Sequence, residues 1–230
     1  MRIKHALLVI TASTALLAQT ATPPQKHSDP ASLPTAGLLS EPGPTFRIND
    51  SELAEPLTFI TYGDMRFTDL ANTTASNPRV RRWLVTRIAE ERPGAVILNG
   101  DVPLAGNVRN DYAVFKAETQ AWRDNRLRVF SALGNHEFHG DPQECLDNWW
   151  QAFPEVRNRR WYSVQLGSRV YVIALDSDAS LMPESDQARW LKKQNKFAAD
   201  HRRLRGFQHA SSSCRRRTDA HRNQSQSKTK

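Results

Sequence analysis

The sequence predicts an α/β fold with a parallel sheet, because short apolar segments alternate along it with amphipathic ones. Residues 57–62, 95–98 and 128–133 are short, mostly apolar runs of the kind that form buried strands. Between them lie residues 78–92 and 111–126, where apolar side chains recur at helical spacing. Strands that alternate with helices in this way indicate βαβ units, so we expect the three strands to pair in parallel.

Start and stop signals bound these helices. Asn77 can cap the first helix, Pro78 fits its first turn, and Pro93-Gly94 ends it. Apolar residues share one face in each helix: Val80, Leu84 and Ile88 in the first, Ala113, Ala117 and Ala121 in the second. Further elements are predicted downstream: a helix from Asp141 through Trp150, strands over 161–165 and 170–176, and a helix from Ser185 through Leu191.

The amino-terminal residues 1–21 have the pattern of a secretory signal peptide. Arg2 and Lys4 precede an apolar stretch at residues 6–17, which is too short to span a membrane. The alternative is a short buried helix at the edge of the domain. We expect an exported protein, periplasmic or secreted, without a stable membrane anchor.

The net charge of +8 belongs to the carboxyl-terminal tail. Residues 201–230 carry nine basic side chains and one acidic one, so residues 1–200 are neutral overall. We predict a Pro-rich linker at 22–55, a globular domain at 56–200 and a disordered basic tail at 201–230. A nucleic-acid-binding function would rest on this tail, where only Phe207 interleaves the charges, so we expect no nucleic-acid partner.

A polar motif follows each of the three predicted strands directly. The motifs are Gly63-Asp64-Met65-Arg66, Gly100-Asp101 and Gly134-Asn135-His136-Glu137. In open α/β sheets ligands bind beyond the carboxyl ends of the strands, and right-handed crossovers bring these ends to one edge. We therefore expect Asp64, Asp101, Asn135 and His136 to converge, with the glycines allowing the sharp turns.

The residue types in these motifs indicate a metal site. Two carboxylates and an amide oxygen are hard ligands, and a nearby imidazole adds a nitrogen ligand or a proton donor. Such a set suits Mn, Mg, Fe or Zn, and a pair of these ions can clamp a phosphate and activate a water. One carboxylate has to bridge the two ions, and Asp101 on the middle motif is the candidate.

These motifs resemble the first three signature blocks of the calcineurin-like metallophosphoesterases. The resemblance rests on Asp64, on the Asn99-Gly100-Asp101 turn and on Gly134-Asn135-His136-Glu137. It continues in one bacterial branch of the family through Trp161-Tyr162-Ser163-Val164, Leu175-Asp176-Ser177 and Gln187-Ala188-Arg189-Trp190-Leu191. It implies a partial β-sandwich with flanking helices, whose C-terminal half is missing, and hydrolysis of a phosphate ester by a metal-activated water.

The resemblance also implies a role for each motif residue. Asp64 would bind the first of two divalent ions, Asp101 would bridge both, and Asn135 would bind the second. His136 would protonate the leaving group or hold the phosphate. Family members usually have His at the position of Arg66, so this chain lacks one nitrogen ligand, and Arg66 would contact the phosphate instead.

Other polar and aromatic residues near the motifs are expected to have structural roles. Glu137 is expected to support its loop, and His139 to be exposed without binding metal. Four tryptophans are expected to pack in the core: Trp149, Trp150, Trp161 and Trp190.

The later histidine ligands of the family do not occur in this sequence. His201, His209 and His221 have a spacing that fits neither of the expected blocks. A shifted reading frame over residues 200–219 can encode a strand followed by a histidine–proline block, so we hypothesise a frameshift near Asp200. The alternative is a natural basic tail. Either way, we expect weak metal binding and impaired activity.

Two functions therefore remain open on the residues alone. The first is a metal-dependent hydrolase of phosphate esters that uses two divalent ions. The second is a non-catalytic remnant or phosphate-binding module, favoured by the missing ligands and by Arg66. The residues specify neither the ester nor an oligomeric state.

Overall fold

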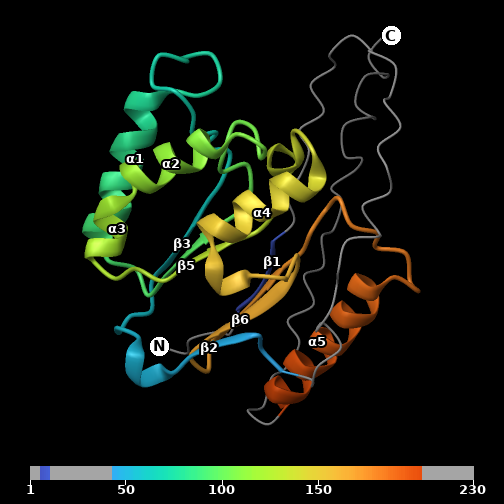
Figure 1. Cartoon of the computed structure of the whole chain (residues 1–230). Helices are drawn as coiled ribbons and strands as arrows, with labels where there is room; N and C mark the ends of the chain where they lie inside the picture. Colours follow the sequence, from blue (N-terminus) through green and yellow to red (C-terminus); the bar gives the residue numbers. More distant parts are fainter. Residues whose placement is uncertain (1–5, 11–42, 204–230) are drawn as a thin grey trace, which may run out of the picture.

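The computed structural model describes residues 6–10 and 43–203 of the chain. These residues form two β-sheets and five α-helices, joined by loops and short 3₁₀ turns (Figure 1). No helix in the described ranges is both long enough and apolar enough to cross a bilayer. The predicted α/β class is confirmed.

The three predicted strands form a parallel sheet. β3 (Phe59–Tyr62), β4 (Ala95–Leu98) and β5 (Val129–Ser131) lie in the order β3-β4-β5. All four residues of β4 are buried, because both faces of this central strand are covered. The parallel pairing brings the carboxyl ends of the three strands to the same edge of the sheet.

A second sheet has the strand order β1-β7-β6-β2. Its strands are β1 (Ala6–Ile10), β2 (Phe46–Ile48), β6 (Tyr162–Leu166) and β7 (Val170–Ala174). β6 and β7 pair antiparallel, as neighbours joined by a short turn do, whereas β1 pairs in parallel with β7 and β2 with β6. The sheet is therefore mixed.

Side chains alternate across the second sheet and divide the interior into two cores. Val164 and Val172 lie in the main core together with residues of β4 and the nearby helices. Tyr171 and Ile173, which point the other way, lie in a smaller core with Trp190 of α5 (Asp186–Arg203). This period of two is the signature of a sheet that is covered on both faces.

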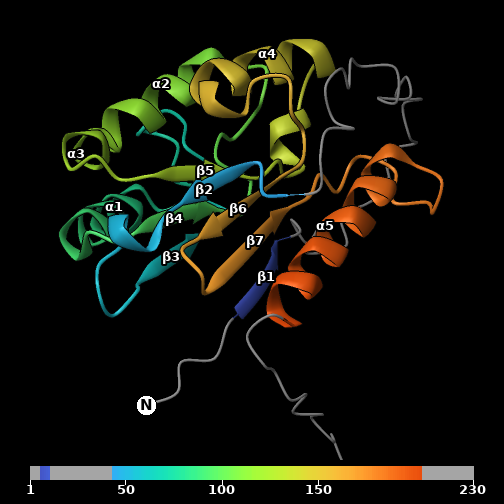
Figure 2. The same cartoon turned by 90° about the horizontal axis from the view of Figure 1, so that it is seen from below.

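The remaining helices pack with the first sheet. They are α1 (Pro78–Glu91), α2 (Arg109–Glu118), α3 (Gln120–Asp124) and α4 (Pro142–Ala152). Figure 2 shows α2, α3 and α4 on one side of the strands and α5 on the other. The four tryptophans expected in the core are all buried: Trp149, Trp150, Trp161 and Trp190.

The buried faces of the early helices differ from the predicted ones. In α1 Ile88 is buried as predicted, but the exposed fraction of Val80 is 44% and Leu84 is only half-buried. Arg81 and Val85 complete the buried face. The expected alanine stripe of the second helix is exposed: Ala113, Ala117 and Ala121. The apolar spacing identified the helices correctly, but alanine is small enough to lie on a solvated face, and larger side chains fill the core.

The segment predicted as one helix over 111–126 is two helices. The chain leaves helical geometry at Thr119, whose hydroxyl donates a hydrogen bond to the carbonyl of Phe115 at 2.6 Å. A β-branched residue that bonds back to the preceding turn competes with helix continuation. The break lets Phe115 of α2 and Trp122 of α3 both reach the core.

The structure also refines the predicted segment boundaries. β1 lies in the stretch assigned to the signal peptide, as a strand beside β7 rather than as a buried helix. β2 lies inside the predicted linker, and its Ile48 is buried in the main core. Helix α5 continues to Arg203, past the predicted domain end at residue 200. Residues 1–5, 11–42 and 204–230, with most of the linker and tail, lie outside the described ranges.

Candidate active site at the strand ends

The three motif loops lie against one another beyond the carboxyl ends of β3, β4 and β5. The backbone N–H of Arg66 donates to the carbonyl of Asp101 at 2.9 Å, and the N–H of Asp64 donates to the carbonyl of Gly100 at 3.3 Å. The N–H of His136 donates to Oδ1 of Asp101 at 3.2 Å, although 35 positions separate them. The sheet topology thus brings these loops together.

Asn135 joins this cluster from the third loop. It is the N-cap of the 3₁₀ turn His136–Phe138 and has helical backbone angles, with φ −68° and ψ −29°. Its side chain does not cap that turn. Asn135 therefore adjoins the cluster through its neighbour His136, whose backbone N–H donates to Asp101.

Two glycines allow the loops to approach this closely. A Cβ at Gly100, where φ is +91°, would lie 2.6 Å from the backbone N of Gly134. A Cβ at Gly134 would lie 2.3 Å from Oδ1 of Asp101. Any side chain at either position would collide with the neighbouring loop, so these glycines fix how near Asp101 can come to the third motif.

Backbone strain is concentrated at the same place. Asp64 (φ 55°), Arg66 (φ 46°) and Asp101 (φ 55°) all occupy the left-handed region. Aspartate tolerates this region better than most residues, but arginine rarely adopts it. Strained residues persist where the surrounding contacts fix them, and they cluster at functional sites. The sharp turns expected at the glycines are therefore only part of the geometry, because Asp64 after Gly63 and Asp101 after Gly100 are left-handed themselves.

Arg66 lies between the two carboxylates. Its Nη2 is 3.2 Å from Oδ1 of Asp64 and 3.8 Å from Oδ2 of Asp101. The side chain of Asp64 is 76% exposed, whereas that of Asp101 is only 11% exposed. Asp101 is therefore the better shielded carboxylate of the pair, and the guanidinium neutralises part of the negative charge there.

The buried carboxylate of Glu137 holds together the loops that follow β4 and β5. Its Oε2 accepts hydrogen bonds from the backbone N–H groups of Asp101 at 2.8 Å and Gly134 at 2.7 Å, and its Oε1 accepts one from Val102 at 2.9 Å. Burial raises the pKa of Glu137 to about 7, while the three N–H donors oppose the rise by stabilising the carboxylate. Its expected role as a support is confirmed by these contacts.

The rings of the two histidines of the third loop contact each other in a tilted arrangement. The ring centroids of His136 and His139 lie 4.2 Å apart. Nδ1 of His136 is 2.6 Å from the carbonyl of Leu104, and because a carbonyl only accepts, Nδ1 carries the proton. Nε2 of His136 is therefore an acceptor in the neutral ring and becomes a donor only when the ring is doubly protonated. His139 is exposed, as expected.

A pocket of about 390 Å³ opens beside Asp64 and Arg66. Its lining combines polar and apolar side chains from β3, the first loop and the start of α1: Tyr62, Asp64, Met65, Arg66, Ala75, Ser76, Asn77, Val80, Arg81 and Leu84. Burial raises the pKa of Tyr62 to about 12, so its hydroxyl stays protonated at neutral pH. The pocket provides space next to the carboxylate of Asp64 and the guanidinium of Arg66.

Arg81 is a buried residue beside the first loop that the sequence patterns did not single out. Its guanidinium makes two hydrogen bonds to Glu118, at 3.0 and 2.9 Å, and one to the carbonyl of Arg66 at 3.3 Å. It therefore anchors the strained first loop to α1 and α2. The signal was present in the sequence, because Arg81 shares a helical face with Val85 and Ile88 and is the one charged residue on that face.

The motif loops carry oxygen atoms of the kind that could hold a hard cation. Among the described residues, no group of three or more His, Cys, Asp and Glu side chains is arranged to hold a metal ion. Oδ2 of Asp101 lies 3.8 Å from Nη2 of Arg66, and its Oδ1 accepts the hydrogen bond from the N–H of His136. The buried Oδ1 of Asn99, beside Gly63, has no hydrogen-bond partner in the described part of the chain. Carboxylate and amide oxygens of this kind are the ligands that hard divalent ions take in proteins.

Comparisons with known proteins identify no family for this chain. No protein-family model matches this chain, and no curated protein matches it.

Proposed function

We propose that this chain is a metal-dependent phosphoester hydrolase of calcineurin-like type, with its site at the strand-end loops. The observation that carries the proposal is the meeting of Asp64, Asp101 and His136 at one edge of a parallel sheet. The finer fold assignment is also part of the proposal. Two packed sheets with α2–α4 on one side and α5 on the other agree with a partial β-sandwich of that family.

Each residue has a task in this proposal. A divalent ion bound between Asp101 and Asn135 would lower the pKa of a water and polarise the phosphate. The second ion implied by the resemblance would need nitrogen ligands beyond those that the described residues supply. In its doubly protonated form, His136 would pass the proton on Nε2 to the leaving oxygen, while the carbonyl of Leu104 keeps the other proton on Nδ1.

Arg66 takes the place of a cation on the Asp64 side. Its Nη2 already lies between Asp64 and Asp101, and a planar guanidinium can bind two phosphate oxygens at once. The pocket beside it would hold the organic group of the ester. Arg66 thus orients the phosphate toward Asp101 and Asn135.

The position of Arg66 favours a second candidate function. Because its guanidinium pairs with the carboxylates that would hold metal, the site can also act as a phosphate-binding module without turnover. This candidate predicts that inorganic phosphate binds to the chain in the absence of metal. It also predicts that the affinity falls about tenfold or more in Arg66→Gln, which lacks the charge.

A steady-state assay with p-nitrophenyl phosphate and added Mn²⁺ tests the leading proposal. We expect slow, metal-dependent turnover that falls about 100-fold in His136→Ala and at least as far in Asp101→Asn. Arg66→His should raise turnover, because it adds a nitrogen ligand and removes the competing cation. Asp124→Asn, on the exposed surface of α3, is the matched control and should leave the rate unchanged.

Turnover that persists in Asp101→Asn and His136→Ala would contradict the hydrolase proposal. Phosphate binding without metal-dependent turnover in the wild type or in Arg66→His would instead establish the phosphate-binding module.

A further inference from the structure

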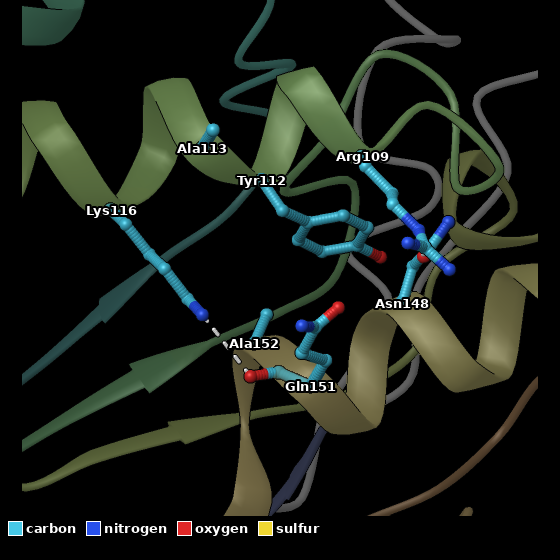
Figure 3. A pocket seen from close by; sticks show the side chains of 7 residues that line it. All are labelled: Arg109, Tyr112, Ala113, Lys116, Asn148, Gln151 and Ala152. Carbon is cyan, nitrogen blue, oxygen red and sulfur yellow. Dashed lines mark hydrogen bonds between the residues drawn. The ribbon is translucent and has the colours of Figure 1, made fainter.

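A second pocket lies between α2 and α4, away from the strand-end loops. It has a volume of about 220 Å³ and is lined by Arg109, Tyr112, Ala113, Lys116, Asn148, Gln151 and Ala152 (Figure 3). None of these residues belongs to the three motif loops. Any ligand of this pocket is therefore separate from the proposed phosphoesterase chemistry.

The hydroxyl of Tyr112 is the first sign of a ligand. The side chain is buried, with an exposed fraction of 4%, and its hydroxyl has no hydrogen-bond partner within the described residues. A buried hydroxyl without a partner costs free energy, so such groups are rare unless something binds to them. Figure 3 shows this hydroxyl pointing toward the ends of Arg109 and Asn148.

The charge of the pocket is the second sign. Arg109 and Lys116 stand at opposite ends of the lining, and none of the described residues that line it is acidic. Nε of Arg109 donates to Oδ1 of Asn148 at 3.1 Å, which orients the guanidinium, while its two Nη groups make no hydrogen bond to the described part of the chain. Two cations without a carboxylate make a pocket that attracts an anion.

The two ends of the pocket differ in chemistry. Lys116 is already engaged, because its Nζ donates to the backbone carbonyl of Gln151 at 3.2 Å. Near it lie the methyl groups of Ala113 and Ala152 and the ring of Tyr112, which form an apolar surface (Figure 3). Hydrogen-bond donors without partners are therefore concentrated at the Arg109 end.

We propose that this pocket binds a small organic anion. Its carboxylate or phosphonate oxygens would accept hydrogen bonds from Nη of Arg109 and from the hydroxyl of Tyr112. Its short apolar part would lie on Ala113, Ala152 and the tyrosine ring. Burial holds the pKa of Tyr112 well above its usual value, so the hydroxyl is a proton donor at any physiological pH.

Titration calorimetry with benzoate and with phenylphosphonate, a non-hydrolysable oxyanion of similar shape, tests this proposal. Benzamide, which is uncharged, is the matched ligand control and should bind at least about tenfold more weakly than benzoate. Preference for one of the two anions identifies which oxyanion geometry the pocket takes. Both should bind with one site per chain.

Two variants locate the site. Tyr112→Phe removes only a hydroxyl that has no partner, so it should leave the unfolding temperature unchanged and weaken anion binding about tenfold. Arg109→Gln should weaken binding by about tenfold or more. Arg123→Gln, which removes a basic residue of α3 outside the pocket, should change the affinity less than about twofold.

Binding of benzoate that equals that of benzamide would overturn the proposal. Anion binding of unchanged affinity in Tyr112→Phe would also overturn it, since this substitution is expected to leave folding intact. Because neither variant touches the motif loops, a failure here would leave the phosphoesterase proposal intact.

Discussion

Glu137 and Asp101 are joined by a hydrogen bond of 2.8 Å from the backbone N–H of Asp101 to the buried carboxylate of Glu137. The same carboxylate oxygen also accepts from Gly134. One side chain thereby ties the loop after β4 to the loop after β5. The position of Asp101 relative to the third loop therefore depends on Glu137.

Glu137→Gln should lower the free energy of unfolding by about 1–3 kcal/mol. The amide NH₂ would face a backbone N–H that the carboxylate now satisfies, which leaves a buried donor without an acceptor. Urea unfolding followed by circular dichroism measures this. Glu184→Gln, on an exposed loop, is the control and should change stability by less than about 0.5 kcal/mol. Equal stability of the two variants would rule out the support role.

Gly134→Ala should destabilise the chain by about 1–3 kcal/mol, because the added Cβ would overlap Oδ1 of Asp101. Gly43→Ala is the matched control. A Cβ there meets only a ring atom of Phe197, at 3.9 Å, which is an ordinary contact. Thermal unfolding of the two variants gives the comparison. Unfolding of Gly134→Ala at the wild-type temperature would contradict the close contact between the loops that carry Gly134 and Asp101.

Glu118→Gln should cost about 3 kcal/mol, because it leaves the guanidinium of Arg81 buried without a compensating charge. The side chains of this pair are only 3% and 9% exposed. The control is Glu90→Gln on the same helix as Arg81. It breaks a pair with Arg87 whose side chains are about half exposed, and should cost at most about 1 kcal/mol. A cost that does not differ between the two would contradict the anchoring role of Arg81.

His139 should contribute stability that depends on pH. Although His139 is exposed overall, partial desolvation of its ring and the neighbouring His136 hold its pKa below the usual 6.5. Below that pH the folded state therefore binds fewer protons than the unfolded chain. The contribution is therefore present above pH 6.5 and is lost as the pH falls through the folded pKa. Unfolding free energies from pH 7 to pH 5 should decline more steeply in the wild type than in His139→Asn. Parallel declines would show that His139 is not coupled to folding.

The sequence predicts the strands and their motifs because the signal is local. An uninterrupted apolar run such as β4, followed by Gly100-Asp101, indicates a buried strand and a sharp turn within a few residues. Parallel pairing and the common edge then follow from the handedness of βαβ connections. The sequence therefore predicts that Asp64, Asp101 and His136 meet at this edge, and the structure shows the loops that carry them in contact.

The features that sequence reasoning missed depend on contacts between distant segments. The pairing of β1 with β7 joins residues more than 160 positions apart, as in Ala6 and Val170, and no local pattern reveals it. The burial of Arg81 depends on Glu118 in another helix. The three-residue strand β2 is too short for its alternation to stand out in a Pro-rich stretch.

Anomalous diffraction from crystals soaked in Mn²⁺ tests most directly whether the strand-end loops form a metal site. The account predicts one ion within coordination distance of the side-chain oxygens of Asp101 and Asn135, and its loss in Asp101→Asn. Crystals that show no manganese between these residues at saturating concentration, or manganese that remains in Asp101→Asn, would contradict it.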